Sequence, residues 1–221
     1  MIIYKIFLQL YKKSRDLFYK IVGIKVSNKP MMKYEEIDLI KEVIQKIKPV
    51  YCLEWGCGYS TLYFPDFIDK KATWLSIEHD FEWFNRINIL NCNSMVEINY
   101  IKSSINNKIE FNNYLSFPKS ISNKYDLILI DGRSRVKCIT EAVNLLNENG
   151  VVILHDANRK RYHNVFNLYK YSEYFQSPYK DAYGIWLGSN DIPINYLINI
   201  KKQKVIWKFH NLLTHIFKLG E

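Results

Sequence analysis

The stretch that decides the fold is Leu53-Glu54-Trp55-Gly56-Cys57-Gly58-Tyr59-Ser60-Thr61-Leu62, which directly follows a short apolar run. Its two glycines, Gly56 and Gly58, allow a sharp backbone turn and a close approach to a ligand without Cβ clashes. Ser60 or Thr61 then supplies the N-cap of the next helix. The segment therefore predicts a strand, a ligand-binding turn and a helix whose N-terminus faces the ligand.

Two departures separate this turn from a dinucleotide-binding loop. Thr61 replaces the third glycine of the G-x-G-x-x-G pattern, and the carboxylate of Glu54 stands two residues before the first glycine. An acidic side chain at that point favours a ligand with a positive charge over a pyrophosphate. Both departures argue against a nicotinamide-dependent oxidoreductase.

Apolar runs typical of buried strands alternate with helix-like stretches on both sides of the turn. The strand-like runs are Val50–Leu53, Ala72–Ile77, Met95–Ile101, Leu127–Ile130, Val151–Leu154 and Tyr183–Leu187. The helix-like stretches are Tyr34–Ile47, Ser60–Ile68, Phe81–Leu90, Val136–Leu146 and Arg159–Tyr171. Short, continuously apolar strands with helices between them indicate a sheet that is covered on both faces. The sequence predicts an α/β domain with a doubly wound, mostly parallel, Rossmann-like sheet.

A second carboxylate, Glu78, ends the second predicted strand, 22 residues after Gly56. At a strand end of a doubly wound sheet, its two acceptor oxygens suit the two hydroxyls of a ribose. The other interpretation of such an acid, a helix cap, fits Asp80 better than Glu78. His79 either lines an adenine pocket or is an ordinary surface or capping histidine.

These motifs, together with the later run Tyr125–Gly132, resemble the class I S-adenosylmethionine (SAM)-dependent methyltransferases. The resemblance covers roughly residues 34–188 and implies that SAM is the cofactor. The residues that it assigns to SAM are Glu54, Gly56, Gly58, Ser60, Thr61, Glu78 and His79. Within this set, the glycines are expected to border the methionine moiety, Glu54 to serve its amino group and Glu78 to bind the ribose.

A second block of polar residues follows the fourth and fifth predicted strands. It consists of Asp131-Gly132-Arg133-Ser134-Arg135 and His155-Asp156. Because both segments lie at carboxyl ends of strands, they are expected to converge on the cofactor crevice. The arrangement resembles small-molecule and glycan O-methyltransferases, including glucuronoxylan methyltransferase-like proteins. It implies transfer of a methyl group to a hydroxyl, or less readily an amine, of a sugar, a glycan or another small polar acceptor.

The expected catalytic residues are Asp131, Arg133, His155 and Asp156. An alcohol acceptor needs a group that takes its proton, and Asp131, His155 and Asp156 are the candidate bases. His155 has the ordinary pKa best suited to proton transfer near neutral pH. Arg133 and Arg135 either pair with a carboxylate or phosphate of an acidic acceptor, or pair with acids of the protein itself.

The same block leaves a divalent metal open. Catechol-type methyltransferases, a more distant comparison, hold a metal with an Asp at each of these strand ends and an Asn directly after the second. Asp131 and Asp156 match two of these ligands, whereas Ala157 replaces the Asn. Two oxygen ligands are few for a hard cation, and Asn158 or His155 completes the set only from a shifted position.

The net charge of +9 is concentrated at the two ends of the chain. Residues 1–30 carry +6 and residues 194–221 carry +4, which leaves −1 for residues 31–193. The chain thus divides into a basic amphipathic N-terminal helix with a linker, a methyltransferase domain and a basic amphipathic C-terminal segment. Such ends are typical of helices that lie on an anionic membrane surface, on the domain itself or on a second subunit.

The neutral middle of the chain argues against a nucleic-acid partner. Amino-directed base methyltransferases carry Asn/Asp-Pro-Pro-Tyr/Phe where this chain has Asp131-Gly132-Arg133-Ser134. A nucleic-acid methyltransferase is thus a less favoured alternative to an enzyme with a small acceptor. A non-catalytic scaffold subunit is the other alternative. Four cysteines without metal-ligand spacing and the lack of a membrane-spanning apolar run predict a cytoplasmic protein, at the inner membrane face if its basic ends bind lipid.

Overall fold

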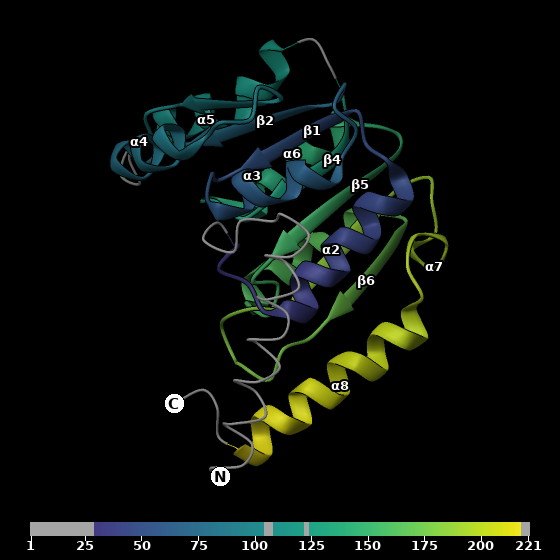
Figure 1. Cartoon of the computed structure of the whole chain (residues 1–221). Coiled ribbons are helices and arrows are strands. Elements are labelled where there is room, and N and C mark those ends of the chain that lie inside the picture. The colour runs from purple at the N-terminus through teal and green to yellow at the C-terminus, as the bar shows by residue number, and fades with distance from the viewer. Residues whose placement is uncertain (1–28, 104–107, 122–123, 218–221) are drawn as a thin grey trace.

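The computed structural model describes residues 29–103, 108–121 and 124–217, which form a seven-stranded sheet with helices on both faces (Figure 1). The strands are β1 (Tyr51–Trp55), β2 (Thr73–Glu78), β3 (Val96–Tyr100), β4 (Tyr125–Ile130), β5 (Leu146–His155), β6 (Tyr171–Phe175) and β7 (Ile185–Ser189). Their order in space is β3-β2-β1-β4-β5-β7-β6. Only β7 runs antiparallel to its neighbours, β5 and β6. The predicted doubly wound, mostly parallel sheet is confirmed.

The helices divide between two layers. The α-helices are α2 (Tyr34–Ile47), α3 (Tyr59–Tyr63), α4 (Phe81–Leu90), α5 (Lys108–Ser120), α6 (Arg135–Leu145), α7 (Ile194–Leu197) and α8 (Ile200–Phe217), and the 3-10 helices are η2 (Phe64–Phe67) and η3 (Lys160–Leu168). One face of the sheet packs against α2, η2, α7 and α8, and the other against α5, α6 and η3. In β4, Leu127 and Leu129 enter the first core while Ile128 and Ile130 enter the second. A strand buried on both sides has no polar face, which explains its continuous apolar run.

Several elements differ from the sequence prediction. The helix expected over residues 60–68 is shorter, because α3 ends at Tyr63 and the chain tightens into a 3-10 turn that contains Pro65. The helix expected over residues 159–171 is the 3-10 helix η3, and β6 begins where that helix was expected to end. Neither α5 nor β6 was predicted; β6 is an edge strand with only one fully buried residue, so it lacks an apolar run.

The two basic ends have different outcomes. The helix predicted in residues 1–30 lies outside the described residues, apart from Lys29 and Pro30. The C-terminal segment is helical as predicted, and Trp207 of α8 packs against Phe175 of β6 with ring centroids 5.5 Å apart. Among the described helices, none combines the length and the apolar character that crossing a bilayer requires.

The strand order reverses between β1 and β4, and this positions the site. Trp55 and Ile130, the last residues of these strands, are partners in the register. The backbone N–H of Asp131 still donates to the carbonyl of Trp55, at 3.0 Å. The turns that follow β1 and β4 therefore leave the sheet side by side, at the point where doubly wound folds bind their ligands.

Candidate active site

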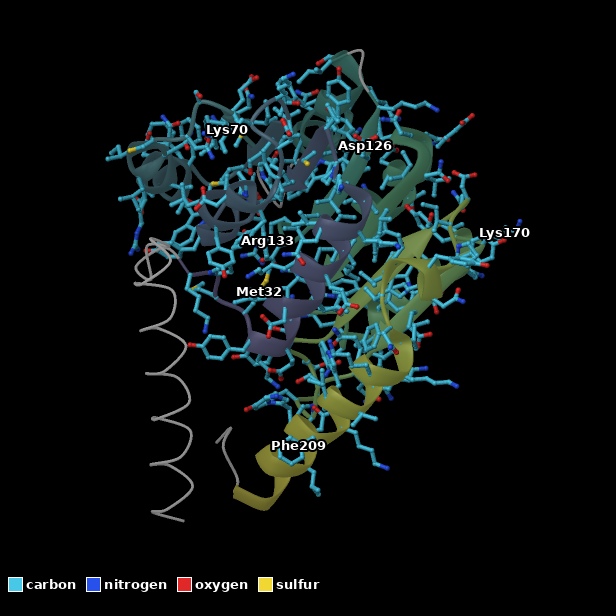
Figure 2. The ribbon with its side chains drawn as sticks, turned by 45° about the vertical axis from the view of Figure 1, so that its right-hand side comes forward. Met32, Lys70, Asp126, Arg133, Lys170 and Phe209 are labelled. Atoms are coloured by element: carbon cyan, nitrogen blue, oxygen red, sulfur yellow. The ribbon has the colours of Figure 1, made fainter. Side chains whose placement is uncertain are left out.

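A pocket of about 1450 Å³ opens at the carboxyl ends of β1, β2, β4 and β5. The turns that follow these four strands line it, together with residues 30–32 ahead of α2 and residues 182–183 ahead of β7. Met32 and Arg133, two of the lining residues, are labelled in Figure 2. Every site residue predicted from the sequence reaches this pocket except Glu54 and Thr61.

The turn after β1 presses its backbone against the turn after β4. Gly56 has a φ of 97°, which favours glycine, and its N–H donates to the carbonyl of Ile77 at 2.8 Å. A Cβ on Gly56 would overlap the Cα of Gly132 and lie 2.5 Å from its nitrogen. Gly58, in contrast, has extended backbone, and the nearest atom to a Cβ there would be Ser60 Oγ at 3.6 Å. Of the two glycines in the turn after β1, only Gly56 is required by the close approach of the turn after β4.

Glu54 does not face the pocket, contrary to the expectation that it serves the amino group of the cofactor. Its carboxylate is fully buried and accepts hydrogen bonds from four neutral side chains. The donors and distances are Ser60 Oγ at 2.5 Å, Thr61 Oγ1 at 2.7 Å, Trp74 Nε1 at 2.9 Å and Ser76 Oγ at 3.2 Å. Burial raises the pKa of Glu54 to about 7 in spite of these hydrogen bonds. Glu54 therefore fixes the loop from inside the protein.

Thr61 shares this interior role. Its hydroxyl donates to Glu54 and accepts the backbone N–H of Gly58 at 2.9 Å, and the side chain is fully buried. Ser60 also donates to Glu54, but it lines the pocket as predicted. The loop is thus supported by a buried network, and it presents mainly its backbone to a ligand.

Glu78 lies where the ribose prediction needs it. Its Oε1 accepts the backbone N–H groups of His79 at 2.8 Å and Asp80 at 2.9 Å, and its Oε2 accepts that of Cys57 at 3.0 Å. The carboxylate lines the pocket, and Oε2 accepts one backbone N–H among the described residues, so it keeps a position for a further donor. Asp80 caps α4 by accepting from the N–H of Trp83 at 2.9 Å, which is the role predicted for it.

His79 and Trp83 form the wall beside Glu78. The imidazole of His79 lies in the pocket lining, with its Nδ1 2.7 Å from Glu78 Oε1 and its ring 5.9 Å from that of Tyr114. Trp83 was not predicted as a site residue; its indole donates to the carbonyl of Cys57 at 2.6 Å and its ring meets Tyr59 edge-on at 6.2 Å. No sequence signal marked it, because an aromatic residue in the first turn of a helix is common in cores.

The ends of β4 and β5 hold a charged chain of three residues. His155 Nδ1 lies 2.9 Å from Asp131 Oδ1, and its Nε2 lies 3.4 Å from Glu36 Oε2. Burial alone would lower the pKa of His155, but the two carboxylates outweigh it and raise the pKa to about 10. His155 is therefore an imidazolium near neutral pH and holds no free lone pair for a proton. The ordinary pKa that favoured His155 among the three candidate bases therefore does not hold in the fold.

Glu36 is the site residue that sequence reasoning missed. It is fully buried in the first turn of α2, where its Oε1 accepts the N–H of Gly184 at 2.7 Å and its Oε2 accepts that of Lys33 at 2.8 Å. An acid in the first turn of a helix is ordinary, since it complements the helix dipole. Nothing in its local sequence indicates that it faces a histidine at the far end of β5.

Arg135 connects the two strand ends. Its guanidinium donates to three backbone carbonyls, those of Gly132 at 2.9 Å, Asp131 at 2.7 Å and His155 at 2.5 Å. It also pairs with Asp131 Oδ1 at 2.9 Å and with Asp156 Oδ2 at 3.2 Å. The side chain is buried and its donors are used within the protein. Of the two interpretations of Arg135, the structure thus shows pairing with acids of the protein itself.

Asp131 and Asp156 differ in whether both of their carboxylate oxygens already have a partner within the protein. Burial would raise the pKa of Asp131, but His155 and Arg135 outweigh burial and lower it. Asp131 Oδ2 receives no hydrogen bond from any described residue. Asp156, with a φ of 57°, accepts the N–H of Tyr183 at 2.7 Å on Oδ1 and pairs with Arg159 at 2.8 Å on Oδ2. Asp131 is thus the carboxylate available to an acceptor.

The residues do not fit a divalent metal. Ligand atoms of Asp131, His155 and Asp156 lie within 4.8 Å of one another, but the imidazolium and the guanidinium of Arg135 already supply positive charge between the two carboxylates. Asn158, the other candidate ligand, is buried and bonds to Tyr174 Oη at 2.7 Å and to backbone groups of the loop before β7. Metal ligation requires a deprotonated imidazole and several free oxygens, whereas Asp131 Oδ2 is the one carboxylate oxygen of this pair that the described residues leave free.

Exposed basic residues lie at the end of the pocket formed by the turns after β4 and β5, where an acceptor is expected and which is called the acceptor end below. Arg133 lines the pocket, is exposed, and has no ion pair with any described residue. Lys137 and Arg161 also line it and are exposed. Tyr162 lies between them and the interior, with its hydroxyl 3.3 Å from Arg159 Nη1 and 3.2 Å from Arg161 Nη2. This end of the pocket offers unneutralised positive charge to a ligand.

Comparison with solved structures identifies the fold. An O-methyltransferase from Bacillus cereus in complex with S-adenosylhomocysteine (SAH) is 17% identical, with a TM-score of 0.57, over 74% of this chain and 85% of that one. An O-methyltransferase of tomaymycin synthesis from Streptomyces achromogenes, in complex with SAM, is 14% identical, with a TM-score of 0.56, over 79% and 86%. A methyltransferase-like protein from Silicibacter pomeroyi is 16% identical, with a TM-score of 0.53, over 80% and 96%.

These likenesses show the class I methyltransferase fold for this chain. No protein-family model and no curated protein sequence matches it. The likenesses extend over 96%, 85% and 86% of the chains of these three neighbours. What the site does must be argued from its own residues.

Proposed function

We propose that this protein is a SAM-dependent methyltransferase that acts on a hydroxyl group of a small polar acceptor. One observation carries the proposal: Glu78 and the loop of Gly56 and Gly58 open into the same pocket as the ionised carboxylate of Asp131. A ribose-binding acid and a hydroxyl-binding acid in one cavity suit a donor and an acceptor bound face to face.

The cofactor end of the pocket fits SAM by its chemistry. Glu78 Oε2 keeps an acceptor position for a ribose hydroxyl, and the backbone of the turn after β1 lies open to the methionine moiety. His79 and Trp83 add flat, partly apolar surface beside the ribose site. When bound, SAM supplies an electrophilic methyl group on a sulfonium.

At the acceptor end, Asp131 is the residue proposed to hold the reacting hydroxyl. Its Oδ1 is fixed by His155 and Arg135, which keeps the carboxylate ionised and aimed. Its Oδ2 is then able to accept the hydroxyl hydrogen and to take the proton as the oxygen gains its methyl group. His155 positions Asp131 through its own charge and does not take the proton itself.

We further propose that the acceptor is a sugar, a glycan unit or a similar molecule that carries a carboxylate or phosphate. Arg133, Lys137 and Arg161 support this, because guanidinium and ammonium groups at a pocket rim attract such anions. The three carboxylates of Glu36, Asp131 and Asp156 are balanced by the three cations of His155, Arg135 and Arg159, so the rim residues are left for the ligand.

The test is calorimetric binding of SAM, SAH and NAD to the wild type, to Glu78→Gln and to the control Glu97→Gln, an exposed acid of β3 outside the pocket. We expect SAM and SAH to bind, NAD not to bind, and Glu78→Gln to weaken both sulfur ligands by about 10–100-fold, since a lost hydrogen bond to a charged group costs about 1.5–3 kcal/mol. Methyl transfer to a panel of neutral and acidic sugars then identifies the acceptor.

Failure of the folded wild type to bind either ligand would overturn the proposal in favour of a non-catalytic scaffold. Binding of SAM together with methyl transfer to nucleic acid, and to none of the sugars, would replace the small acceptor by a nucleic acid. Equal SAM affinity in wild type and Glu78→Gln would remove Glu78 from the ribose site.

A further inference from the structure

Helix α8 has one face that belongs to the domain. Gln203 and Trp207, one turn apart, are each only 3% exposed. Gln203 donates to Glu42 Oε2 at 2.6 Å, and Trp207 packs on Phe175. Asn211, a further turn along, donates to the carbonyl of Gln176 at 2.8 Å. This inner face fixes the rotation of the helix about its axis.

The opposite face of α8 is apolar and exposed. Val205, Phe209 and Leu212 are 69%, 57% and 53% exposed, and their spacing of four and three residues puts them on one stripe. That stripe lies on the far side of the helix from Gln203 and Trp207. Figure 1 shows α8 at the edge of the molecule beside β6, and Phe209 is labelled on it in Figure 2.

Three of the lysines beside this stripe have no ion pair with an acid in the described part of the chain. Lys201, Lys202 and Lys208 are exposed at helical positions next to it, and α8 contains neither Asp nor Glu. Lys204, which lies nearer the sheet, pairs with Glu173 of β6 at 2.8 Å. An apolar stripe between unneutralised lysines is the pattern of a helix that lies in the interface of an anionic bilayer.

We infer that α8 docks this protein on the surface of an anionic lipid bilayer, with Val205, Phe209 and Leu212 inserted and the flanking lysines on the lipid phosphates. Each lysine near such a surface strengthens binding about fivefold, and each buried methylene group about fourfold. A second copy of the chain fits less well, because pairing two such faces would set lysine against lysine. Residues 1–28 carry a further net charge of +5, so they add to the attraction of an anionic surface and do not neutralise α8.

The test is sedimentation of the full chain with vesicles of phosphatidylcholine alone and of phosphatidylcholine with about one third phosphatidylglycerol. One variant, Phe209→Ser with Leu212→Ser, removes the stripe, and a second, Lys201→Glu with Lys208→Glu, reverses the charge. The control is Ile89→Ser with Lys70→Glu, which changes an exposed apolar residue of α4 and an exposed lysine ahead of β2, both outside α8.

We expect the wild type and the control to sediment with the anionic vesicles only, and high salt to release them. Both α8 variants should lose at least about tenfold in vesicle affinity while they keep the wild-type unfolding curve. Equal binding by the α8 variants and the wild type, no binding by any of them, or a dimer that Phe209→Ser with Leu212→Ser dissociates would each overturn the assignment.

Discussion

Carboxylates lie in or directly behind the wall of the pocket at both of its ends, but the protein satisfies them in opposite ways. At the cofactor end, Glu54 and Glu78 are held by hydroxyls, an indole and backbone N–H groups, all of them neutral. At the acceptor end, Asp131 and Asp156 are held by the cations of His155, Arg135 and Arg159. The neutral donors fix the backbone of the turn after β1, whereas the cations keep the carboxylate of Asp131 ionised.

This difference determines what each end is suited for. A shape that is fixed without cations keeps the cofactor end receptive to a positively charged ligand. At the acceptor end, the cations keep Asp131 ionised and aimed, which a hydroxyl acceptor requires. The acceptor end thus has within the protein the positive charge that a metal would otherwise bring.

The largest effect is expected where the two ends touch. Gly56→Ala places a Cβ into the backbone of Gly132 at a φ of 97°, so we expect a loss of about 3–5 kcal/mol in the free energy of unfolding. Urea unfolding measures it. Gly58→Ala, whose Cβ meets only ordinary contacts, is the control and should stay within about 1 kcal/mol of the wild type. Equal losses would mean that the close approach is not what constrains the turn.

Removal of the cation that joins β4 and β5 is expected to be nearly as costly. Arg135→Leu leaves Asp131 facing Asp156 and strips three carbonyls of their donor, and we expect about 3–5 kcal/mol of destabilisation. Arg133→Leu, an exposed neighbour, should change stability by less than about 0.5 kcal/mol. A stable Arg135→Leu variant that gains affinity for Mg²⁺ or Mn²⁺ would show that the carboxylates themselves tolerate each other.

Asp131→Asn separates catalysis from binding. Because the amide cannot take a proton, we expect kcat to fall about 100-fold or more while the SAM affinity stays the same. Single-turnover methyl transfer and calorimetry measure the two quantities. An unchanged kcat would remove Asp131 from the proton-accepting role and leave it a positioning residue.

His155 makes stability depend on pH. Its folded pKa of about 10 lies above the ordinary 6.5, so its stabilising contribution is complete below pH 6.5 and is lost as the pH rises through 10. The difference in unfolding free energy between wild type and His155→Gln should therefore shrink by on the order of 1–3 kcal/mol from pH 6.5 to pH 10. Urea unfolding of both proteins at several pH values tests this, and parallel curves would contradict an imidazolium at this position.

The smallest effect is expected at the rim. Arg133→Leu should raise the KM for an acidic acceptor by about two- to fivefold, the equivalent of one exposed ion pair, and should leave kcat and SAM binding unchanged. Lys160→Leu, an exposed lysine outside the pocket lining, is the control. If both variants behave alike, the anion does not bind at Arg133.

The comparison also shows what a sequence reveals. The apolar runs indicated the sheet, and the residues around Gly56 and Glu78 indicated the cofactor end, because a turn and its strand end are local features. The motif could not distinguish a Glu54 that faces a ligand from one that faces the interior, since both need an acid beside the same turn. Sequence spacing also could not reveal Glu36, which reaches His155 only through the packing of α2 on the sheet.

Arg135 is a second residue whose role could not be predicted from the sequence. Its sequence position allowed both an acceptor contact and an internal pairing, and only the approach of β4 to β5 decides between them. The pKa of His155 was likewise predicted from its ordinary value, because the two carboxylates that raise it come from different elements. Charge networks between distant elements are properties of the assembled fold.

The contact between Gly56 and Gly132 has a consequence for how such a protein acquires new acceptors. Two backbones in contact leave no side chain to exchange, so the separation between the turn after β1 and the turn that carries Asp131 is a constant of the scaffold. Selection, natural or in the laboratory, can act instead on Arg133, Lys137 and Arg161, which are exposed and replaceable. The reaction geometry is inherited with the fold, and the choice of acceptor is free to drift at its edge.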